Sequence, residues 1–145
     1  MYRRKLAAAR GLKQVQAIQG MDNDPKLPGP ADDRPGQLDA VLIVNAYHEF
    51  DGSRDAMLKS IRRSLRLNGT LGIIDKDADR DPNETRERYE FRHQLPRSFV
   101  IEDLKRAGFR TIVEKMDFKP TGNRAGERWY LIVASTNCLP SGFCF

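Results

Sequence analysis

Apolar residues along this chain follow two patterns. Some stand side by side, as in residues 41–44 (VLIV), which is typical of a strand buried on both faces of a sheet. Others recur three and four positions apart, as in the segment 53–67, which is typical of a helix that buries one face. The predicted elements are helices over 1–10, 53–67 and 98–107 and strands over 15–19, 38–45, 70–75, 110–116 and 128–135.

Turn-forming residues mark the ends of these elements. Ser53 or Asp51 can cap the start of the second helix, and Asn68-Gly69 is expected to end it in a left-handed turn. Gly108 closes the third helix in the same way. The segment 76–97 between them is rich in charge, and we expect it to be irregular.

The order of the elements predicts an α/β fold with a mostly parallel sheet. Strands that alternate with helices run parallel, because the helix returns the chain to the starting edge of the sheet. The last two strands are joined by KPTGNRAGE, which is short and carries no helix, so they are expected to form an antiparallel hairpin. We expect one domain over residues 1–135 and a frayed tail over 136–145.

Composition supports a globular domain in a reducing compartment. The 145 residues are 39% apolar and 31% charged, and no run approaches the roughly 20 apolar residues of a membrane span. The start has basic residues but no apolar stretch of a secretory signal. Cys138 and Cys144 stand in C-x5-C spacing, which is not a common zinc pattern, so we expect free thiols and a cytoplasmic location.

The net charge of +5 is spread along the chain with acidic residues interleaved. This distribution indicates a solvated surface. A nucleic-acid binder using Arg62, Arg63, Arg66 and the basic residues of 1–5 is the weaker alternative, because stacking aromatics and an ordered basic stripe are missing.

Polar and aromatic side chains follow the apolar strand over 38–45 without a break. In α/β sheets, ligands bind beyond the carboxyl ends of the parallel strands. The loop after Gly20, residues 45–50 (NAYHEF) and the segment after Asp75 should therefore share one rim of the sheet. The structural alternative is that Tyr47 and Phe50 cap the core while His48 and Glu49 bond to nearby backbone.

Common catalytic motifs are missing from the sequence. His48-Glu49 does not extend to H-E-x-x-H, because position 52 is glycine, and His93 is the only other histidine, so no metal site is predicted. A G-x-S-x-G elbow, a phosphate-binding G-x-x-x-x-G-K-[ST] loop and a G-x-G-x-x-G turn are absent too.

Four segments in order resemble the second half of the class I S-adenosylmethionine-dependent methyltransferases. They are LDAVLIVNAYHEF, MLKSIRRSLRLNGTLGIID, RHQLPRSFVIEDLKRAGF and RWYLIVAS, and GLKQVQAIQGMDNDPKLP resembles the family's third strand and its loop. The resemblance covers about residues 3–135. In the family's LkPGG turn, Leu67 replaces proline and Asn68 the first glycine, and asparagine tolerates the left-handed geometry of that turn.

The resemblance implies a Rossmann-like sheet in the order 3-2-1-4-5-7-6 and methyl transfer from S-adenosylmethionine to an acceptor that the sequence does not identify. By resemblance, Asn45, Ala46 and Tyr47 flank the cofactor and Asp22 contacts the adenine amino group. His48, Glu49 and His93 then position the acceptor, a small molecule or another group, or remove its proton.

The same resemblance implies that the chain is truncated at its amino terminus. The family's glycine-rich first strand and the acid that ends its second strand have no counterpart in this sequence. We therefore expect the chain alone to lack catalytic activity, and the strand over 38–45 to expose an apolar edge. The alternative function is a non-catalytic interaction module, in which this edge pairs with a protein partner or a second copy.

Overall fold

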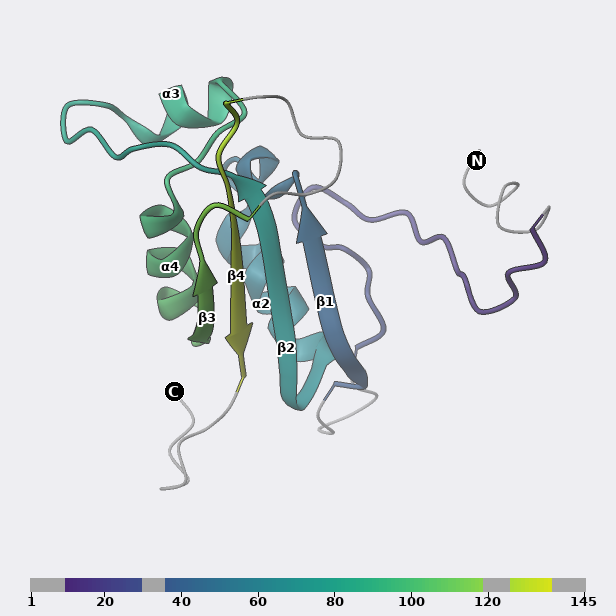
Figure 1. The fold of residues 1–145 in the computed structure, drawn as a ribbon. Helices are drawn as coiled ribbons and strands as arrows, with labels where there is room; N and C mark the ends of the chain where they lie inside the picture. The colour runs from purple at the N-terminus through teal and green to yellow at the C-terminus, as the bar shows by residue number, and fades with distance from the viewer. Residues whose placement is uncertain (1–9, 30–35, 119–125, 137–145) are drawn as a thin grey trace.

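A computed structural model describes residues 10–29, 36–118 and 126–136 of the chain. Four strands form one sheet in the order β1-β2-β4-β3 (Figure 1). β1 runs parallel to β2, and β4 runs antiparallel to both β2 and β3. The elements are β1 (Leu38–Val44), the short 3-10 helix η1 (Tyr47–Glu49), α2 (Arg54–Ser64), β2 (Leu65–Lys76), α3 (Arg86–Phe91), α4 (Arg97–Arg106), β3 (Arg110–Lys115) and β4 (Trp129–Ser135).

This arrangement confirms the predicted α/β class and the antiparallel terminal hairpin. The described strands match the 4-5-7-6 part of the strand order that the resemblance implied. The parallel pair β1 and β2 is connected through α2, which lies behind the sheet in Figure 1. Both strands therefore end at the same rim, as the sequence predicted.

One face of the sheet carries the hydrophobic core. Alternate residues of a strand point to the same face, so Leu71 and Ile73 of β2 lie beside Ile132 of β4. All three are fully buried, and they pack in one cluster with Leu58 of α2 and Leu104 of α4. The spacing of apolar residues in the two helices accounts for this packing, because each presents one apolar side to the sheet.

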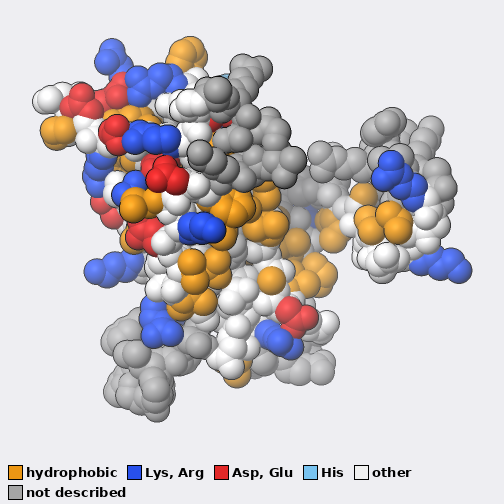
Figure 2. All heavy atoms as spheres, viewed as in Figure 1, with side chains coloured by type: hydrophobic (Ala, Val, Ile, Leu, Met, Phe, Trp, Pro, Cys, Tyr) orange, Lys and Arg blue, Asp and Glu red, His pale blue; other side chains and the backbone are white. Residues whose placement is uncertain are grey.

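The opposite face of the sheet is largely uncovered among the described residues. A row of pairs crosses all four strands through Leu42, Gly72, Val133 and Val113. Leu42 is 62% exposed and Val44 is 50% exposed. Figure 2 shows hydrophobic side chains gathered over the strands on this face. The prediction that β1 is buried on both faces is therefore wrong, whereas its expected apolar edge is present.

The predicted strand over 15–19 is also absent. Its residues form no regular element, and the nearest pairing is an isolated bridge between Met21 and Asp24. Val15 and Ile18 are exposed. A strand needs a neighbour to accept and donate its backbone hydrogen bonds, and no described strand lies beside this segment.

The end of α2 and the structure of the segment 76–97 differ from the predictions. α2 ends at Ser64, because Leu65 is already extended and pairs with Leu38 at the start of β2. Asn68 does adopt the predicted left-handed conformation, with φ 66°, but it lies within the bounds of β2. The segment 76–97, predicted to be irregular, contains the short helix α3.

Three predictions fall outside the described residues: the helix over 1–10 except its last residue, the frayed tail except Thr136, and the state of Cys138 and Cys144. The helices that the structure describes include none with the length and apolar character needed to cross a lipid bilayer.

Candidate functional site

The candidate site lies where β1 and β2 end. Val44 pairs with Ile74, and the backbone N–H of Asn45 donates to the Ile74 carbonyl at 2.8 Å. Asn45 then takes a left-handed conformation, with φ 50°, which turns the chain into η1. This turn brings residues 47–49 against Asp75 at the end of the neighbouring strand.

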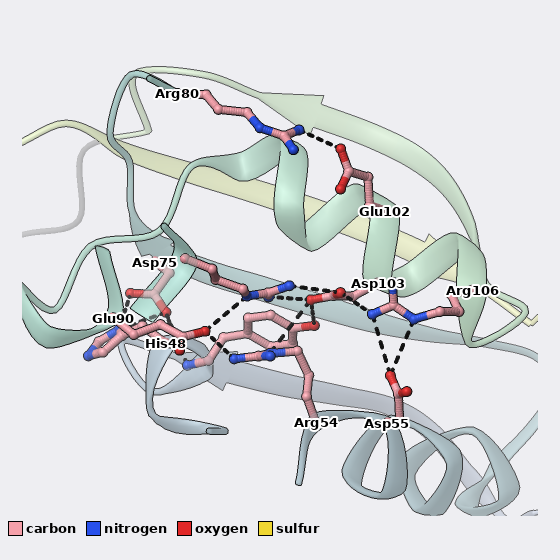
Figure 3. Close-up of polar contacts among 11 residues, drawn as sticks. His48, Arg54, Asp55, Asp75, Arg80, Glu90, Glu102, Asp103 and Arg106 are labelled. Carbon is pink, nitrogen blue, oxygen red and sulfur yellow. Dashed lines mark hydrogen bonds and ion pairs between the residues drawn. The ribbon is translucent and has the colours of Figure 1, made fainter. Parts of the chain in front are cut away.

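Asp75 anchors this turn. Its side chain is fully buried, and its Oδ2 accepts hydrogen bonds from the backbone N–H groups of Tyr47 at 3.0 Å and His48 at 3.2 Å. The His48 ring also faces it, with Nδ1 at 2.9 Å from Oδ1 and 3.0 Å from Oδ2 (Figure 3). A carboxylate accepts and does not donate, so the proton of this bond sits on Nδ1.

The second ring nitrogen of His48 is turned toward Glu49 and His93. His48 Nε2 lies 3.2 Å from Glu49 Oε1, and His93 Nδ1 lies 2.9 Å from the same oxygen. The two imidazole rings meet edge to face, with centroids 5.3 Å apart. We call these three residues the histidine–glutamate cluster. The structure thus brings together all three side chains that were predicted to face the acceptor.

His93 reaches the cluster from the end of α3. Its backbone N–H donates to the Glu90 carbonyl at 2.8 Å, and its φ of 54° is left-handed. The side chains of Glu49 and His93 are 59% and 64% exposed, whereas His48 is nearly buried. The cluster therefore has one anchored inner member and two outer members that meet solvent.

The pKa of His48 reflects two opposing effects. Burial lowers the pKa of the imidazole, because it disfavours the charged form. The hydrogen bond and the negative charge of Asp75, with a smaller contribution from Glu49, raise it by more. The net pKa of His48 is raised, so the surroundings of the ring favour a positive charge at Nε2.

A buried network of charged side chains packs against η1 and holds it in place. Asp103 of α4 is fully buried and accepts hydrogen bonds from the Tyr47 hydroxyl at 3.0 Å and from Arg86 Nη1 at 3.0 Å. Arg106 also donates to Asp103, and Arg54 of α2 lies beside it with Nε 3.6 Å from Oδ2 (Figure 3). The network joins η1, α2, α3 and α4 at one point.

Burial and charge set the pKa values in this network. Burial raises the pKa of Asp103, but the hydrogen bond and charge of Arg86, with Tyr47 and Arg54, lower it more, and the net pKa is below its ordinary value. Burial raises the pKa of Tyr47, and the Asp103 charge raises it further. The carboxylate is thus ionised and the phenol neutral at neutral pH.

The four residues predicted to contact the cofactor differ in exposure and do not all lie at the rim. Asn45 is exposed at the tip of β1, and Ala46 is half-buried. The Tyr47 side chain is fully buried and points to Asp103, which leaves only its backbone near the rim. Asp22 is exposed in the turn bridged by Met21 and Asp24, and the structure shows no hydrogen bond or ion pair between it and the histidine–glutamate cluster within the described part of the chain.

Two open cavities lie beside the rim along the segment after Asp75. Their volumes are about 390 and 490 Å³. Both are lined by Ala78 and Asp79, and the larger one includes Lys76, Gln94 and Arg128. The segment that the sequence placed on the rim therefore borders space of small-molecule size.

Sequence reasoning missed the two residues that hold the site in place. Asp75 ends an apolar strand, and an acid in that position was a usable signal, since a buried carboxylate needs partners. Asp103 stands inside a helical pattern, and nothing in the sequence distinguished it from a solvent-facing acid. Its burial depends on Arg54 of α2 and Arg86 of α3, which come from other elements.

Comparison with known structures identifies the fold. A methyltransferase from Aquifex aeolicus, dependent on S-adenosylmethionine, matches with TM-score 0.65 and 19% identity, over 92% of this chain and 61% of that one. The Burkholderia thailandensis 1,6-didemethyltoxoflavin-N1-methyltransferase, with bound 1,6-didemethyltoxoflavin and S-adenosylhomocysteine, matches with TM-score 0.62 and 18% identity, over 91% of this chain and 55% of that one. The cyclase SpnF matches with TM-score 0.66 and 15% identity, over 91% and 60%.

These matches show that the chain has the class I methyltransferase fold, as the sequence predicted. The chain spans about 55–61% of the length of these three structures. No protein-family model and no curated protein sequence matches the chain. Because a cyclase shares the fold, the reaction has to be argued from the site.

Proposed function

We propose that this chain supplies the acceptor-facing part of a methyltransferase dependent on S-adenosylmethionine, acting on a small molecule. The observation that carries the proposal is the histidine–glutamate cluster, anchored by Asp75 at the carboxyl ends of two parallel strands. That rim is where sheets of this class bind ligands. The methyltransferase neighbours, one of them with 1,6-didemethyltoxoflavin bound, support the same conclusion.

The described residues fit one wall of a cofactor site. Asn45 offers an exposed amide side chain at the strand tip, and the half-buried Ala46 lets a ligand approach the backbone. S-Adenosylmethionine, when bound, supplies the reactive methyl group. The opposite wall would be a glycine-rich turn, which the sequence does not contain. The affinity of this chain alone for S-adenosylmethionine is therefore the quantity to measure.

The cluster residues have separable roles toward the acceptor. Asp75 holds the proton on His48 Nδ1 and so aims Nε2 at the rim. From there His48 Nε2 can take the proton of an acceptor hydroxyl or ring N–H as its oxygen or nitrogen gains the methyl group. Glu49 and His93, at the exposed side, orient the acceptor by hydrogen bonds.

Calorimetric titration of the folded chain with S-adenosylmethionine tests the proposal. We expect saturable binding that Asn45→Gly weakens at least tenfold. Asn68→Gly is the matched control, since Asn68 is also exposed and left-handed but lies elsewhere. A folded chain with no saturable signal up to about 1 mM cofactor, the upper end of ordinary Michaelis constants, overturns the proposal for this chain.

Equilibrium binding of small aromatic hydroxyl or ring-nitrogen compounds to the folded chain tests the acceptor role. We expect Glu49→Gln and His93→Ala to weaken the binding of these compounds while leaving cofactor binding unchanged; equal binding by the variants and the native chain overturns the acceptor role. Two predictions from the sequence stay predictions. One is that β1 pairs with a protein partner or a second copy, and the other is a cytoplasmic location.

A further inference from the structure

The histidine–glutamate cluster has the composition and spacing of a metal site. Two ligand atoms bound tetrahedrally at about 2.0–2.1 Å from one ion lie about 3.3 Å apart. The Glu49 Oε1 atom is 3.2 Å from His48 Nε2 and 2.9 Å from His93 Nδ1. One ligand atom from each of the three residues falls within 4.8 Å of the others. We propose that the cluster binds a divalent transition-metal ion through His48, Glu49 and His93.

Asp75 provides the second, independent observation. Histidines that bind metal ions commonly donate their other ring N–H to a carboxylate, which orients the ring and makes the ligand nitrogen more basic. Asp75 makes this contact with His48 Nδ1 at 2.9 Å, from a fully buried position. The backbone N–H groups of Tyr47 and His48 hold the carboxylate in place.

The charge and the solvent access of the cluster are those of a catalytic metal site rather than of a closed structural one. Glu49 and Asp75 together supply two negative charges beside the ligand atoms, which a divalent ion balances. Two histidines and one carboxylate leave a coordination position open, as in catalytic zinc sites and in non-haem iron sites. The exposed side of the cluster, at Glu49 and His93, is where water or an acceptor would reach that position.

A bound ion changes what the cluster does in the proposed reaction. Its bond to His48 Nε2 occupies the lone pair, so direct proton removal by His48 and metal binding are alternatives. The ion would instead bind the acceptor oxygen or nitrogen and lower its pKa, so that the proton leaves to solvent. The site itself rests only on the cluster and Asp75, and does not depend on methyl transfer.

Titration with Zn²⁺ after removal of metals by a chelator tests the inference. The background is the Cys138→Ser/Cys144→Ser chain, so that tail thiols cannot bind the ion. We expect one equivalent to bind, and Glu49→Gln and His93→Ala to weaken binding at least tenfold. Both side chains are exposed, so these variants should fold, which circular dichroism checks. Glu87→Gln, an exposed carboxylate on neighbouring α3, should bind as the background does.

Two further measurements make the outcome decisive. Co²⁺ should give the intense visible bands of a four-coordinate site, and these should be missing in His93→Ala. Asp75→Asn should weaken Zn²⁺ binding about 10–100-fold, the usual effect of losing such a carboxylate. Absence of stoichiometric binding, or equal binding by the Glu49 and His93 variants, overturns the inference. Cofactor titration of the same variants reports on the proposed function separately.

Discussion

At the scale of single residues, Asp103 shows how strongly one buried carboxylate can organise this chain. It accepts hydrogen bonds from Tyr47, Arg86 and Arg106 and lies beside Arg54. Taking a charge out of water is costly, and the cost is recovered only when partners surround it. Removing the carboxylate would leave the nearby guanidinium groups partly buried without their counter-charge.

We expect Asp103→Asn to lower the free energy of unfolding by about 3 kcal/mol, because breaking a buried ion pair leaves an uncompensated charge. Urea unfolding measures this change. Glu102→Gln is the matched control on the same helix, since Glu102 pairs with Arg80 at the exposed surface. Exposed pairs contribute about 0–1 kcal/mol, so equal losses in the two variants would contradict the prediction.

The lowered pKa of Asp103 makes part of the stability depend on pH. The folded chain binds this proton less tightly than the unfolded chain, for which the pKa is near 3.8. The contribution is therefore present above the unfolded pKa and is lost as the pH falls through the folded pKa. Between about pH 5 and pH 2, we expect the native chain to lose more stability than Asp103→Asn does. Urea unfolding at each pH measures the free energy of unfolding of both proteins. If this free energy falls equally with pH in the native chain and in Asp103→Asn, the prediction is contradicted.

At the scale of elements, the packing of α2 against the start of β1 depends on a glycine. A Cβ built on Gly36 would lie 2.2 Å from the backbone carbonyl of Ser64, where α2 ends. Such a contact is far too short, and backbone atoms cannot move aside as a flexible side chain can. The close approach lets the segment before β1 lie against the end of α2, next to the pair of Leu38 and Leu65 at the start of β2.

Gly36→Ala is therefore expected to destabilise the chain by about 1–3 kcal/mol, the usual cost of overpacking. Gly29→Ala is the control, because a Cβ there meets no atom within 4 Å and Gly29 has no left-handed φ. Thermal unfolding followed by circular dichroism compares them. A Gly36 variant as stable as the Gly29 variant would show that the two elements separate without cost.

The elements also show where sequence patterns succeed. α2 and α4 were placed correctly because apolar residues at helical spacing reveal the buried side of a helix. Their ends were less accurate, because Leu65 is apolar whether it closes a helix or opens a strand. α3 was missed because its six residues carry too few apolar positions to show a period, and only Tyr89 is buried.

At the scale of the whole molecule, the uncovered face of the sheet favours association between copies of the chain. Leu42 and Val44 are exposed on β1, which is the edge of the described sheet. Unpaired edges and apolar faces favour association between chains. We expect the chain to self-associate as its concentration rises.

Leu42→Lys should shift this association toward monomers, because a charged side chain on an edge strand opposes pairing. Light scattering after size-exclusion chromatography measures the mass. Phe91→Lys, which replaces an exposed apolar residue on α3 away from the sheet, should leave the association unchanged. A native chain that stays monomeric at all concentrations, or equal effects of both variants, contradicts the prediction.

The sequence by itself determined the class of fold, the core side of α2 and α4 and the rim that bears His48, because these follow from local spacing and from the rule that parallel strands end together. Only the tertiary structure decided which strand face is buried, that residues 15–19 form no strand, and that Asp75 and His93 meet His48. These outcomes depend on groups distant in the chain. A strand exists only where a neighbour takes its hydrogen bonds, and an acid is buried only where its partners converge.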